Sequence, residues 1–245
     1  MSTDDRLGLP DSDVSRVLVV SAHPDDVDFG VAGTVATWTD AGVAVTYCII
    51  TDGQAGGFDR TVPRDEMVLL RRKEQREAAA RVGVEDVRFL GYVDGDLEPT
   101  KDLVGAIARL IREIRPQRMV VPSPERDYAR IHRSHPDHLA AGKAALDAIY
   151  PAARNPFAHP ELLAEGLEPW TVPDTWLMAH PTSNRAVDIT ATYERKIAAI
   201  LAHASQHEDA AALVAPLREA FTANARVAGL PEGHQAEAFF VVPTA

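Results

Sequence analysis

The sequence predicts an α/β fold: a Rossmann-like, doubly wound, mostly parallel sheet with helices on both faces. Short aliphatic runs alternate along the chain with segments whose apolar residues recur at helical spacing, the pattern of strand–helix units. Two of these runs lead directly into loops rich in histidine and aspartate, as expected where the carboxyl ends of parallel strands meet a ligand. A hydrophobic content of 46% in 245 residues is sufficient for a sizeable core.

Strands and helices alternate regularly in the first third of the chain. An aliphatic run predicts the first strand over 16–22, and Gly42 closes a helix expected over 28–41. The next β-branched run predicts a strand over 43–51. A long charged segment with an inner face of methionine, leucine and alanine then predicts a helix over 64–82.

The middle of the chain repeats this alternation and then departs from it. Strands are expected over 87–90 and 119–121, and helices over 101–114 and 138–149; the first of these helices has the clearest apolar periodicity. Residues 151–173 contain five prolines and predict an irregular excursion. Its candidate roles are a lid over the site or a contact between copies in a homo-oligomer.

The last third predicts a return to regular structure. Strands are expected over 175–179, 186–189 and 238–242, and helices over 191–203 and 210–228.

The domain organisation predicted from these elements is simple. Residues 1–15 are acidic and polar, and we expect them to form a flexible arm. Residues 16–245 are expected to form a single α/β domain.

Charge and hydropathy restrict the class of partner. The net charge of −11 argues against nucleic acid and against an anionic membrane surface, because both attract basic proteins. No apolar run approaches the roughly 18 residues that span a bilayer, and the amino terminus lacks the pattern of a secretory signal, so we expect a cytoplasmic protein. The single cysteine, Cys48, lies in an apolar run and is expected to be a buried core residue.

Two loops concentrate the residues capable of chemistry. The first carries His23-Pro-Asp25-Asp26 at the end of the first strand, where two carboxylates and a histidine lie together. A metal ion resolves the repulsion between them, with one histidine and one aspartate as ligands and the other aspartate free to handle a proton. The second loop, over 131–138, follows the strand at 119–121. Both loops fall on the carboxyl edge of the sheet, so they are predicted to converge on one cation.

The combination of Ala22-His-Pro-Asp-Asp26 with His135-Pro-Asp-His138 resembles the PIG-L/LmbE family of metal-dependent N-acetylglucosaminyl deacetylases. The paired motifs are specific, whereas either motif alone is weak. The resemblance covers roughly residues 16–207, with further matches at Thr51-Asp-Gly53, Ala55-Gly-Gly57, Arg71 with Glu74, Asp94-Gly95, and His203 with Gln206.

The resemblance implies a role for each residue of the two motifs. His23, Asp26 and His138 match the metal ligands of the family, which implies Zn²⁺, with Fe²⁺ or another divalent cation as the alternative. Asp25 matches the general base. His135 matches the second catalytic residue, which as an imidazolium stabilises the oxyanion or protonates the leaving amine.

Other positions have roles that the resemblance supports less directly. Asp137 is expected to orient an imidazole, by its position that of His135. Arg71 and Asp94 resemble the family's substrate-binding residues; the alternatives are a solvated helix residue and a turn residue. His203 and Gln206 recur in the family and are expected to support the wall of the site, with a helix cap as the alternative.

Three positions near the motifs depart from the family pattern or have two readings. His132 matches no role in the family; we expect a plain loop residue, with a place lining the site as the alternative. Val27 stands where many members have glutamate, and the adjacent Asp28 is expected either to replace that glutamate or only to start a helix.

The leading hypothesis is zinc-dependent removal of an N-acetyl group from a glucosamine-containing small molecule. The alternatives are a metal-dependent amidase with a different acyl-amine substrate, a metal-dependent phosphoesterase, and a non-catalytic sugar- or metal-binding protein. The glycine-rich segment 54–63 contains neither GxxxxGK[ST] nor GxGxxG, which argues against a nucleotide cofactor.

Overall fold

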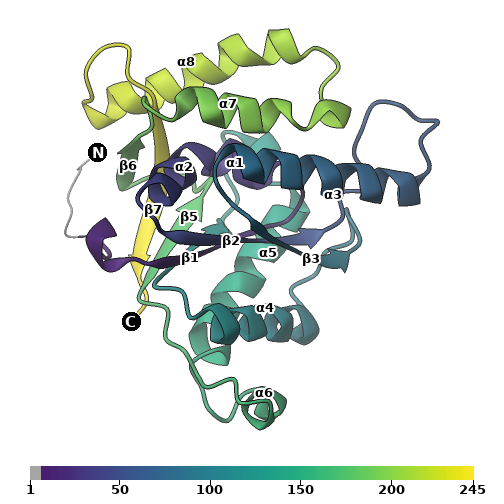
Figure 1. Cartoon of the computed structure of the whole chain (residues 1–245), viewed down its shortest axis with the longest axis vertical. Helices are drawn as coiled ribbons and strands as arrows, with labels where there is room; N and C mark the ends of the chain where they lie inside the picture. The colour runs from purple at the N-terminus through teal and green to yellow at the C-terminus, as the bar shows by residue number, and fades with distance from the viewer. Residues whose placement is uncertain (1–6) are drawn as a thin grey trace.

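The computed structural model describes residues 7–245 apart from the side chain of His132, so the expectation for that histidine lies outside it. Within residues 7–245, seven strands form one sheet in the order β3-β2-β1-β4-β5-β7-β6 (Figure 1). The strands are β1 (Arg16–Ser21), β2 (Ala44–Thr51), β3 (Asp86–Tyr92), β4 (Arg118–Pro122), β5 (Asp174–Met178), β6 (Arg185–Asp188) and β7 (Ala236–Pro243).

The direction of the strands confirms the doubly wound fold. β3, β2, β1, β4 and β5 are parallel neighbours, whereas β7 runs antiparallel to both β5 and β6. The chain moves outward from β1 to β2 and β3, then returns to β4 on the other side of β1. The carboxyl ends of β1 and β4 therefore form the topological switch point, where such sheets bind ligands.

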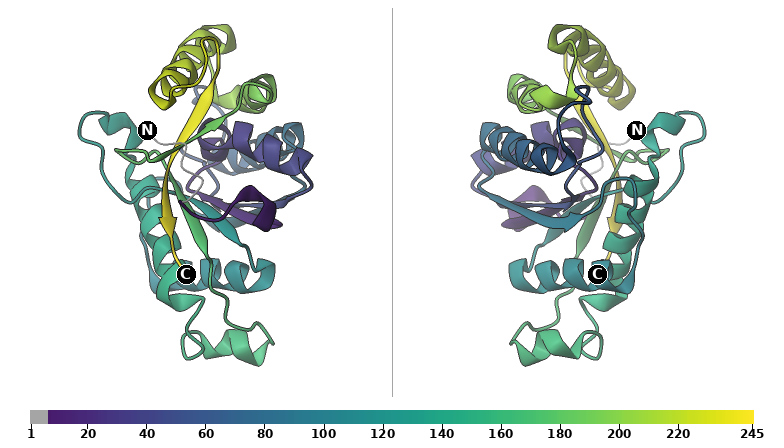
Figure 2. Two further views of the ribbon diagram at one scale, coloured as in Figure 1. Left: turned by 90° about the vertical axis from the view of Figure 1, so that its left-hand side faces the viewer. Right: turned by 90° about the vertical axis from the view of Figure 1, so that its right-hand side faces the viewer.

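Helices cover both faces of the sheet, and a further helical layer lies outside one of them. Figures 1 and 2 show α4 and α5 on one face, α2 and α3 on the other, and α7 and α8 beyond these. The bounds are α1 (Asp26–Gly30), α2 (Ala32–Asp40), α3 (Arg64–Arg81), α4 (Lys101–Ile114), α5 (Pro136–Asp147), α6 (Pro160–Ala164), α7 (Tyr193–Leu201) and α8 (Ala210–Ala228). Among the described residues, no helix is long and apolar enough to cross a bilayer.

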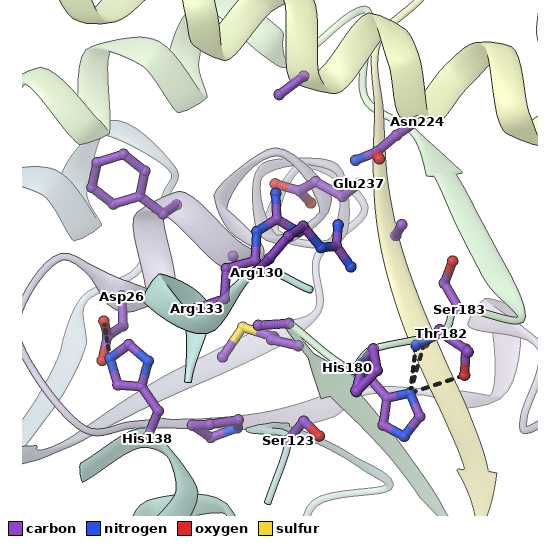
Figure 3. Close-up of a pocket in the computed structure, with 18 of the residues that line it drawn as sticks. Asp26, Ser123, Arg130, Arg133, His138, His180, Thr182, Ser183, Asn224 and Glu237 are labelled. Carbon is purple, nitrogen blue, oxygen red and sulfur yellow. Dashed lines mark hydrogen bonds and ion pairs between the residues drawn. The ribbon is translucent and has the colours of Figure 1, made fainter. Parts of the chain in front are cut away.

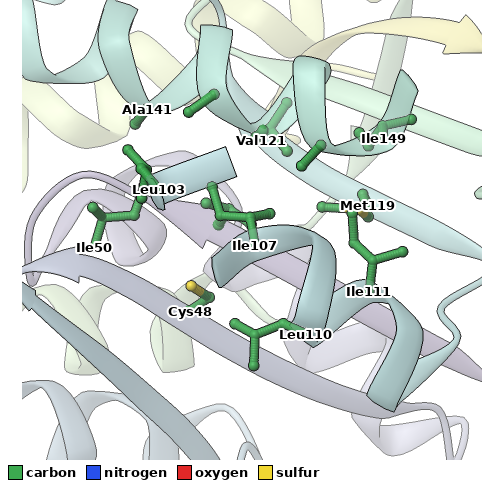
Figure 4. Packing of buried hydrophobic residues seen from close by; sticks show 14 of the residues in the cluster. Cys48, Ile50, Leu103, Ile107, Leu110, Ile111, Met119, Val121, Ala141 and Ile149 are labelled. Atoms are coloured by element: carbon green, nitrogen blue, oxygen red, sulfur yellow. The ribbon is translucent and has the colours of Figure 1, made fainter. Parts of the chain in front are cut away.

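The core on the α4–α5 face follows from the periodicity of α4. Leu103, Ile107 and Ile111 recur on one side of that helix and are fully buried against the sheet (Figure 4). Thr100 caps the helix by accepting a hydrogen bond from the backbone of Leu103. Cys48 is buried in the same cluster, which confirms its expected place in the core.

The helix expected over 28–41 is broken in two at Val31. The backbone of Val31 has φ −143°, and an ion pair between Lys196 and Glu237 replaces helical hydrogen bonds around it. The Lys196 ammonium donates to two backbone carbonyls of α1, and a Glu237 carboxylate oxygen accepts from the amide of Gly33. The break therefore depends on residues far along the chain.

Residues 7–15 pack against the domain, whereas the sequence predicted a flexible arm over 1–15. Arg118 donates hydrogen bonds to the carbonyl of Leu9 at 2.7 Å and to the carboxylate of Asp11 at 2.5 Å. Val14 is buried in the core. Residues 1–6 lie outside the described residues.

The proline-rich excursion lies on the outer side of α4, where it includes α6, and then leads into the amino end of β5 (Figure 1). The buried Arg112 guanidinium donates to the carbonyls of Ala152, Ala153, Asn155 and Ala158, which fixes this irregular backbone. Because both motif loops lie at the carboxyl edge, the excursion is not a lid over them.

Candidate metal centre

Three side chains from the two motif loops converge at the switch point between β1 and β4. The Nε2 atom of His138 lies 3.0 Å from an Asp26 carboxylate oxygen and 3.2 Å from Nδ1 of His23. The other Asp26 oxygen lies 3.4 Å from the same Nδ1 atom. Their donor atoms all lie within 4.8 Å of one another, as required of ligands to a single ion.

This donor set fits a divalent cation. Without one, two ring nitrogens face each other at 3.2 Å, and protons on both rings bring like charges together. Burial lowers the pKa of His23, and the Asp26 and Asp94 carboxylates raise it more strongly, to about 11. An ion in place of these protons satisfies both imidazoles and the carboxylate at once.

The far side of the His23 ring faces two more carboxylates. Its Nε2 atom lies 3.2 Å from Oδ2 of Asp137 and 3.3 Å from Oδ1 of Asp94. The same Asp137 oxygen accepts from the amide of Gly95 at 2.7 Å, while Oδ1 of Asp137 lies 4.0 Å from His135. Asp137 is thus nearer to His23 than to the His135 ring that we expected it to orient.

His23, His135 and Asp137 form a second group with metal-ligand spacing. This second group shares His23 with the first group. Two separate ions could therefore be bound only if the His23 imidazole bridged both ions. A carboxylate behind a coordinating histidine is the usual arrangement for fixing the ring. We therefore assign Asp137 to the support of His23.

Asp25 stands apart from these ligands in a constrained backbone. Its φ of 92° is rare for a residue with a side chain, and Oε1 of Gln75 holds the turn by accepting from the Asp25 amide at 2.8 Å. The Asp25 carboxylate lies 3.0 Å from the Arg71 guanidinium. Burial raises the pKa of the Asp25 carboxyl to about 6, and the charge of Arg71 opposes that rise.

Arg71 lies behind Asp25 and not on the surface that a substrate would meet. It is 3% exposed, and it also donates to the carbonyls of Pro24 at 2.5 Å and Gly53 at 2.9 Å. Gly53 has φ +65°, and a Cβ atom there would lie 2.4 Å from the guanidinium. The neighbouring Arg72 instead pairs with Asp52, so Arg71 is the arginine at the site.

His135 is the N-cap residue directly before α5, and its side chain is 45% exposed. Its Nδ1 atom accepts a hydrogen bond from the amide of Asp137 at 3.2 Å. An Nδ1 that accepts carries no proton, so the ring proton is on Nε2. The ring stands edge-on to His23, with centroids 5.0 Å apart.

A buried hydrogen-bonded chain behind the site was only partly foreseen. Nε2 of Gln75 donates to Asp28, and the same Asp28 oxygen lies 2.8 Å from Nε2 of His203. Asp28 and His203 are fully buried, so Asp28 does more than start a helix. Gln75 was missed, although it lies four residues after Arg71 and hence on the same face of α3.

Gln206 lies against the glycine-rich loop after β2. A Cβ atom at Gly56 would lie 2.4 Å from Oε1 of Gln206, so this loop approaches the helical segment closely. Together with the buried His203, this places both carboxy-terminal matches in the wall behind the site.

The fold and site can be compared with known proteins. Residues 18–149 match the family described as PIG-L, GlcNAc-PI de-N-acetylase. The chain is 33% identical over 203 residues to the diacetylchitobiose deacetylase of Thermococcus kodakarensis, covering 83% of this chain and 74% of that protein. It is 33% identical over 200 residues to a Bacillus cereus protein named probable N-acetyl-alpha-D-glucosaminyl L-malate deacetylase 2, covering 79% of this chain and 84% of that protein. The solved structure of N,N'-diacetylchitobiose deacetylase from Pyrococcus horikoshii is 29% identical in sequence and has a TM-score of 0.89. The match covers 99% of this chain and 87% of that one.

Proposed function

Because this chain belongs to the PIG-L family of N-deacetylases, we propose that it removes the N-acetyl group from a glucosamine-containing small molecule in a zinc-dependent reaction. The observation that carries the proposal is the convergence of His23, Asp26 and His138, with the Asp25 carboxylate beside them and outside the ligand set. Three protein ligands and one open position are typical of catalytic zinc.

The named substrates of the relatives support the sugar part of the proposal. Diacetylchitobiose and N-acetylglucosaminyl malate both carry an acetamido group on a glucosamine ring. We assign Asp94 to the sugar side of the site, because its carboxylate adjoins His23 and is 10% exposed. Its other oxygen accepts from the amide of Ala55, which fixes its position.

A bound divalent cation would acidify water and polarise the amide carbonyl. Asp25 takes the proton of the attacking water as the new carbon–oxygen bond forms, and Arg71 and Gln75 hold it in position. The Nε2–H group of His135 donates a hydrogen bond to the developing oxyanion and keeps its proton. Asp25 then returns its proton to the nitrogen as the carbon–nitrogen bond breaks, giving acetate and the free amine.

This assignment changes the expected state of His135. As a neutral imidazole with its proton on Nε2, it stabilises the oxyanion through a hydrogen bond and not through a full positive charge. Arg71 becomes a positioning residue for Asp25 in place of a substrate contact.

Acetate release from metal-stripped and reloaded protein tests the proposal. The panel contains N-acetylglucosamine, diacetylchitobiose and N-acetylglucosaminides, with Zn²⁺ and Fe²⁺ restored separately. We expect Zn²⁺ to restore release, and the Asp25→Asn variant to bind the ion without releasing acetate. Release from other acyl amines only would redirect the assignment to another amidase, and phosphate-ester cleavage alone would replace it.

A further inference from the structure

A cavity of about 540 Å³ opens beside the metal centre and is not used by the mechanism above. It begins at Asp26 and His138, passes the end of β5 and extends beneath α8, where Asn224 lines it (Figure 3). Ligand-binding cavities have volumes of roughly 300–1,000 Å³, so this one can hold a group far larger than the methyl group of an acetamide.

The cavity lies on the opposite side of the metal ligands from the residue assigned to the sugar. Nε2 of His23 faces the Asp94 carboxylate at 3.3 Å. On the other side of the ring, Nδ1 of His23 faces Asp26 at 3.4 Å and His138 at 3.2 Å. Asp26 and His138 line the cavity, whereas His23 and Asp94 do not. The ligands therefore stand between the sugar side and the cavity.

An amide that is cleaved at this centre has to extend across the ligands. Its carbonyl carbon must lie within reach of Asp25, because Asp25 takes the proton of the water that attacks that carbon. The nitrogen and the acyl chain are bonded to the same planar carbon and point away from each other. With the nitrogen and its sugar on the Asp94 side, the acyl chain points toward the cavity.

The side of the cavity formed by α1, the end of β5 and α8 is apolar. Its side chains are Phe29, Met178, Leu217, Ala220 and Phe221. Met178 and Phe221 also belong to the hydrophobic core of the domain, so this apolar wall continues the core toward the metal centre. Hydrocarbon groups are stabilised when they leave water for such a surface.

Polar residues inside the cavity have partners within the chain. Glu237 accepts a hydrogen bond from the Lys196 ammonium at 2.7 Å and from the amide of Gly33 at 3.0 Å. The side-chain amide of Asn224 donates to the carbonyl of Ala236 at 3.1 Å. These groups are satisfied without a polar ligand.

The cationic residues of the lining also do not require an anion. Arg130 and Arg133 are exposed to solvent, and Arg130 donates to the carboxylate of Asp127 at 2.8 Å. Nδ1 of His180 accepts from the amide of Thr182 at 3.1 Å. The apolar wall is therefore the surface that a ligand of this cavity would cover.

We propose that this cavity binds the acyl part of the substrate, and that the enzyme hydrolyses glucosaminides whose N-acyl group is a linear chain longer than acetyl. The reaction is the same hydrolysis: water adds to the acyl carbon, the carbon–nitrogen bond breaks, and a longer carboxylate leaves with the free amine. The inference rests on the proposed function and adds the length of the acyl chain to it.

The competing occupant is a hydrocarbon group on C1 of the sugar. C1 belongs to the ring that we place on the Asp94 side, so such a group reaches the cavity only by passing the ligands. An acyl chain begins at the carbon that lies among them. The geometry thus favours the acyl chain, and matched substrates separate the two.

The test compares kcat/KM, measured as release of the free amine, for three matched glucosaminides. They are the N-acetyl methyl glycoside, the N-hexanoyl methyl glycoside and the N-acetyl hexyl glycoside. The proteins are the wild type, Ala220→Leu, Ala238→Leu and Ala223→Leu. Ala220 on α8 and Ala238 on β7 line the cavity, whereas Ala223 is an exposed alanine about one turn further along α8 that does not.

We expect the wild type to hydrolyse the N-hexanoyl compound with a kcat/KM at least about tenfold above that of its N-acetyl counterpart, since each buried methylene contributes about fourfold. Ala220→Leu and Ala238→Leu should lower this ratio about tenfold, because the added side chains fill the cavity. Ala223→Leu should keep the ratio of the wild type. Both substrates are compared on the same protein, so a loss of folded protein cancels in the ratio.

Two results would overturn the inference while leaving the deacetylase assignment intact. One is a wild type that hydrolyses the N-hexanoyl compound no faster than the N-acetyl compound. The other is a preference for the hexyl glycoside that the two cavity variants remove, which would place the C1 group in the cavity. Release from the N-hexanoyl compound alone would uphold the inference and remove the N-acetyl part of the proposed function.

If no compound releases its amine, the proposed function fails, and binding decides on the cavity. Calorimetry then compares the N-hexanoyl and N-acetyl methyl glycosides with Zn²⁺-loaded protein. Tighter binding of the N-hexanoyl compound, lost in Ala238→Leu and kept in Ala223→Leu, upholds the inference; equal binding of the two compounds contradicts it.

Discussion

The two ends of β4 hold buried charges in opposite ways. At the amino end, Arg118 is fully buried, donates to Asp174 at 2.7 Å, and lies over the rings of Trp176 and Trp38. At the carboxyl end, His23, His138 and Asp26 meet at 3.0 to 3.4 Å. At the first end, the carboxylates of Asp174 and Asp11 and the carbonyl of Leu9 all accept hydrogen bonds from the one guanidinium. At the second, two imidazoles face each other across one carboxylate.

From this difference we infer which of the two charged clusters is complete within the chain and which one is suited to bind an ion. A guanidinium keeps its charge, so the Arg118 cluster is complete once its carboxylates are in place. Histidines exchange protons for a metal ion, so the second cluster changes its charge when an ion binds. A cluster of polar residues does not by itself identify a binding site. A cluster built on histidines is a candidate metal site, whereas a cluster built on an arginine is a structural one.

Asp25→Asn should have the largest effect of the variants. It should reduce activity at the carboxyl end of β4 and leave the structural cluster at the amino end of that strand unchanged. The amide removes the proton acceptor, so we expect kcat to fall by about 10²- to 10⁴-fold. Metal content, measured by elemental analysis, should remain that of the wild type, because Asp25 lies outside the proposed ligand set. If the variant loses the ion as well as its activity, Asp25 is a metal ligand and not a separate general base.

Arg118→Met should show the converse, a loss of stability without loss of chemistry. It leaves Asp174 buried without its cation, and we expect the free energy of unfolding in urea to fall by about 3–5 kcal/mol. The kcat of the folded fraction should be unchanged. The double variant Arg118→Met/Asp174→Leu should recover part of the lost stability. If Arg118→Met alone unfolds with nearly the same free energy as the wild type, the cluster is not structural.

Gln75→Leu should affect both properties, because Gln75 holds the Asp25 turn from within the core. We expect kcat to fall about tenfold, with the unfolding free energy lowered by about 1–3 kcal/mol. Gln117→Leu is the matched control: Gln117 accepts from the amide of Arg16 at the amino edge of the sheet. It should destabilise without changing kcat, and equal effects on kcat in the two variants would remove the positioning role of Gln75.

Lys143→Gln should have the smallest effect. Lys143 pairs with Asp147 along the exposed side of α5, the helix that also carries His138. Solvent screening limits such pairs, so we expect a change of about 0.3–0.5 kcal/mol in unfolding free energy and none in kcat. A change in kcat would mean that α5 transmits surface changes to the metal ligand.

The sequence was sufficient for most elements because their patterns are local. The strand at β1 and the helix at α4 were predicted to within a residue or two, since aliphatic runs and helical periodicity depend on near neighbours. The convergence of the His23 and His138 loops was also predictable, because both follow parallel strands.

What escaped prediction depends on contacts between distant segments. The break at Val31 requires Lys196 and Glu237, and the packing of residues 7–15 requires Arg118. The nearness of Asp137 to His23 likewise depends on how two loops are placed in space. No local pattern reports such contacts.

The zinc stoichiometry of His138→Ala tests the central claim most directly. The variant is compared with the wild type and with Arg118→Met after stripping and reloading with Zn²⁺. We expect one tightly bound ion per chain in the wild type and in the folded fraction of Arg118→Met, and none in His138→Ala. A wild type that binds no ion, or a His138→Ala variant that retains one, would contradict the assignment of this cluster as the metal centre.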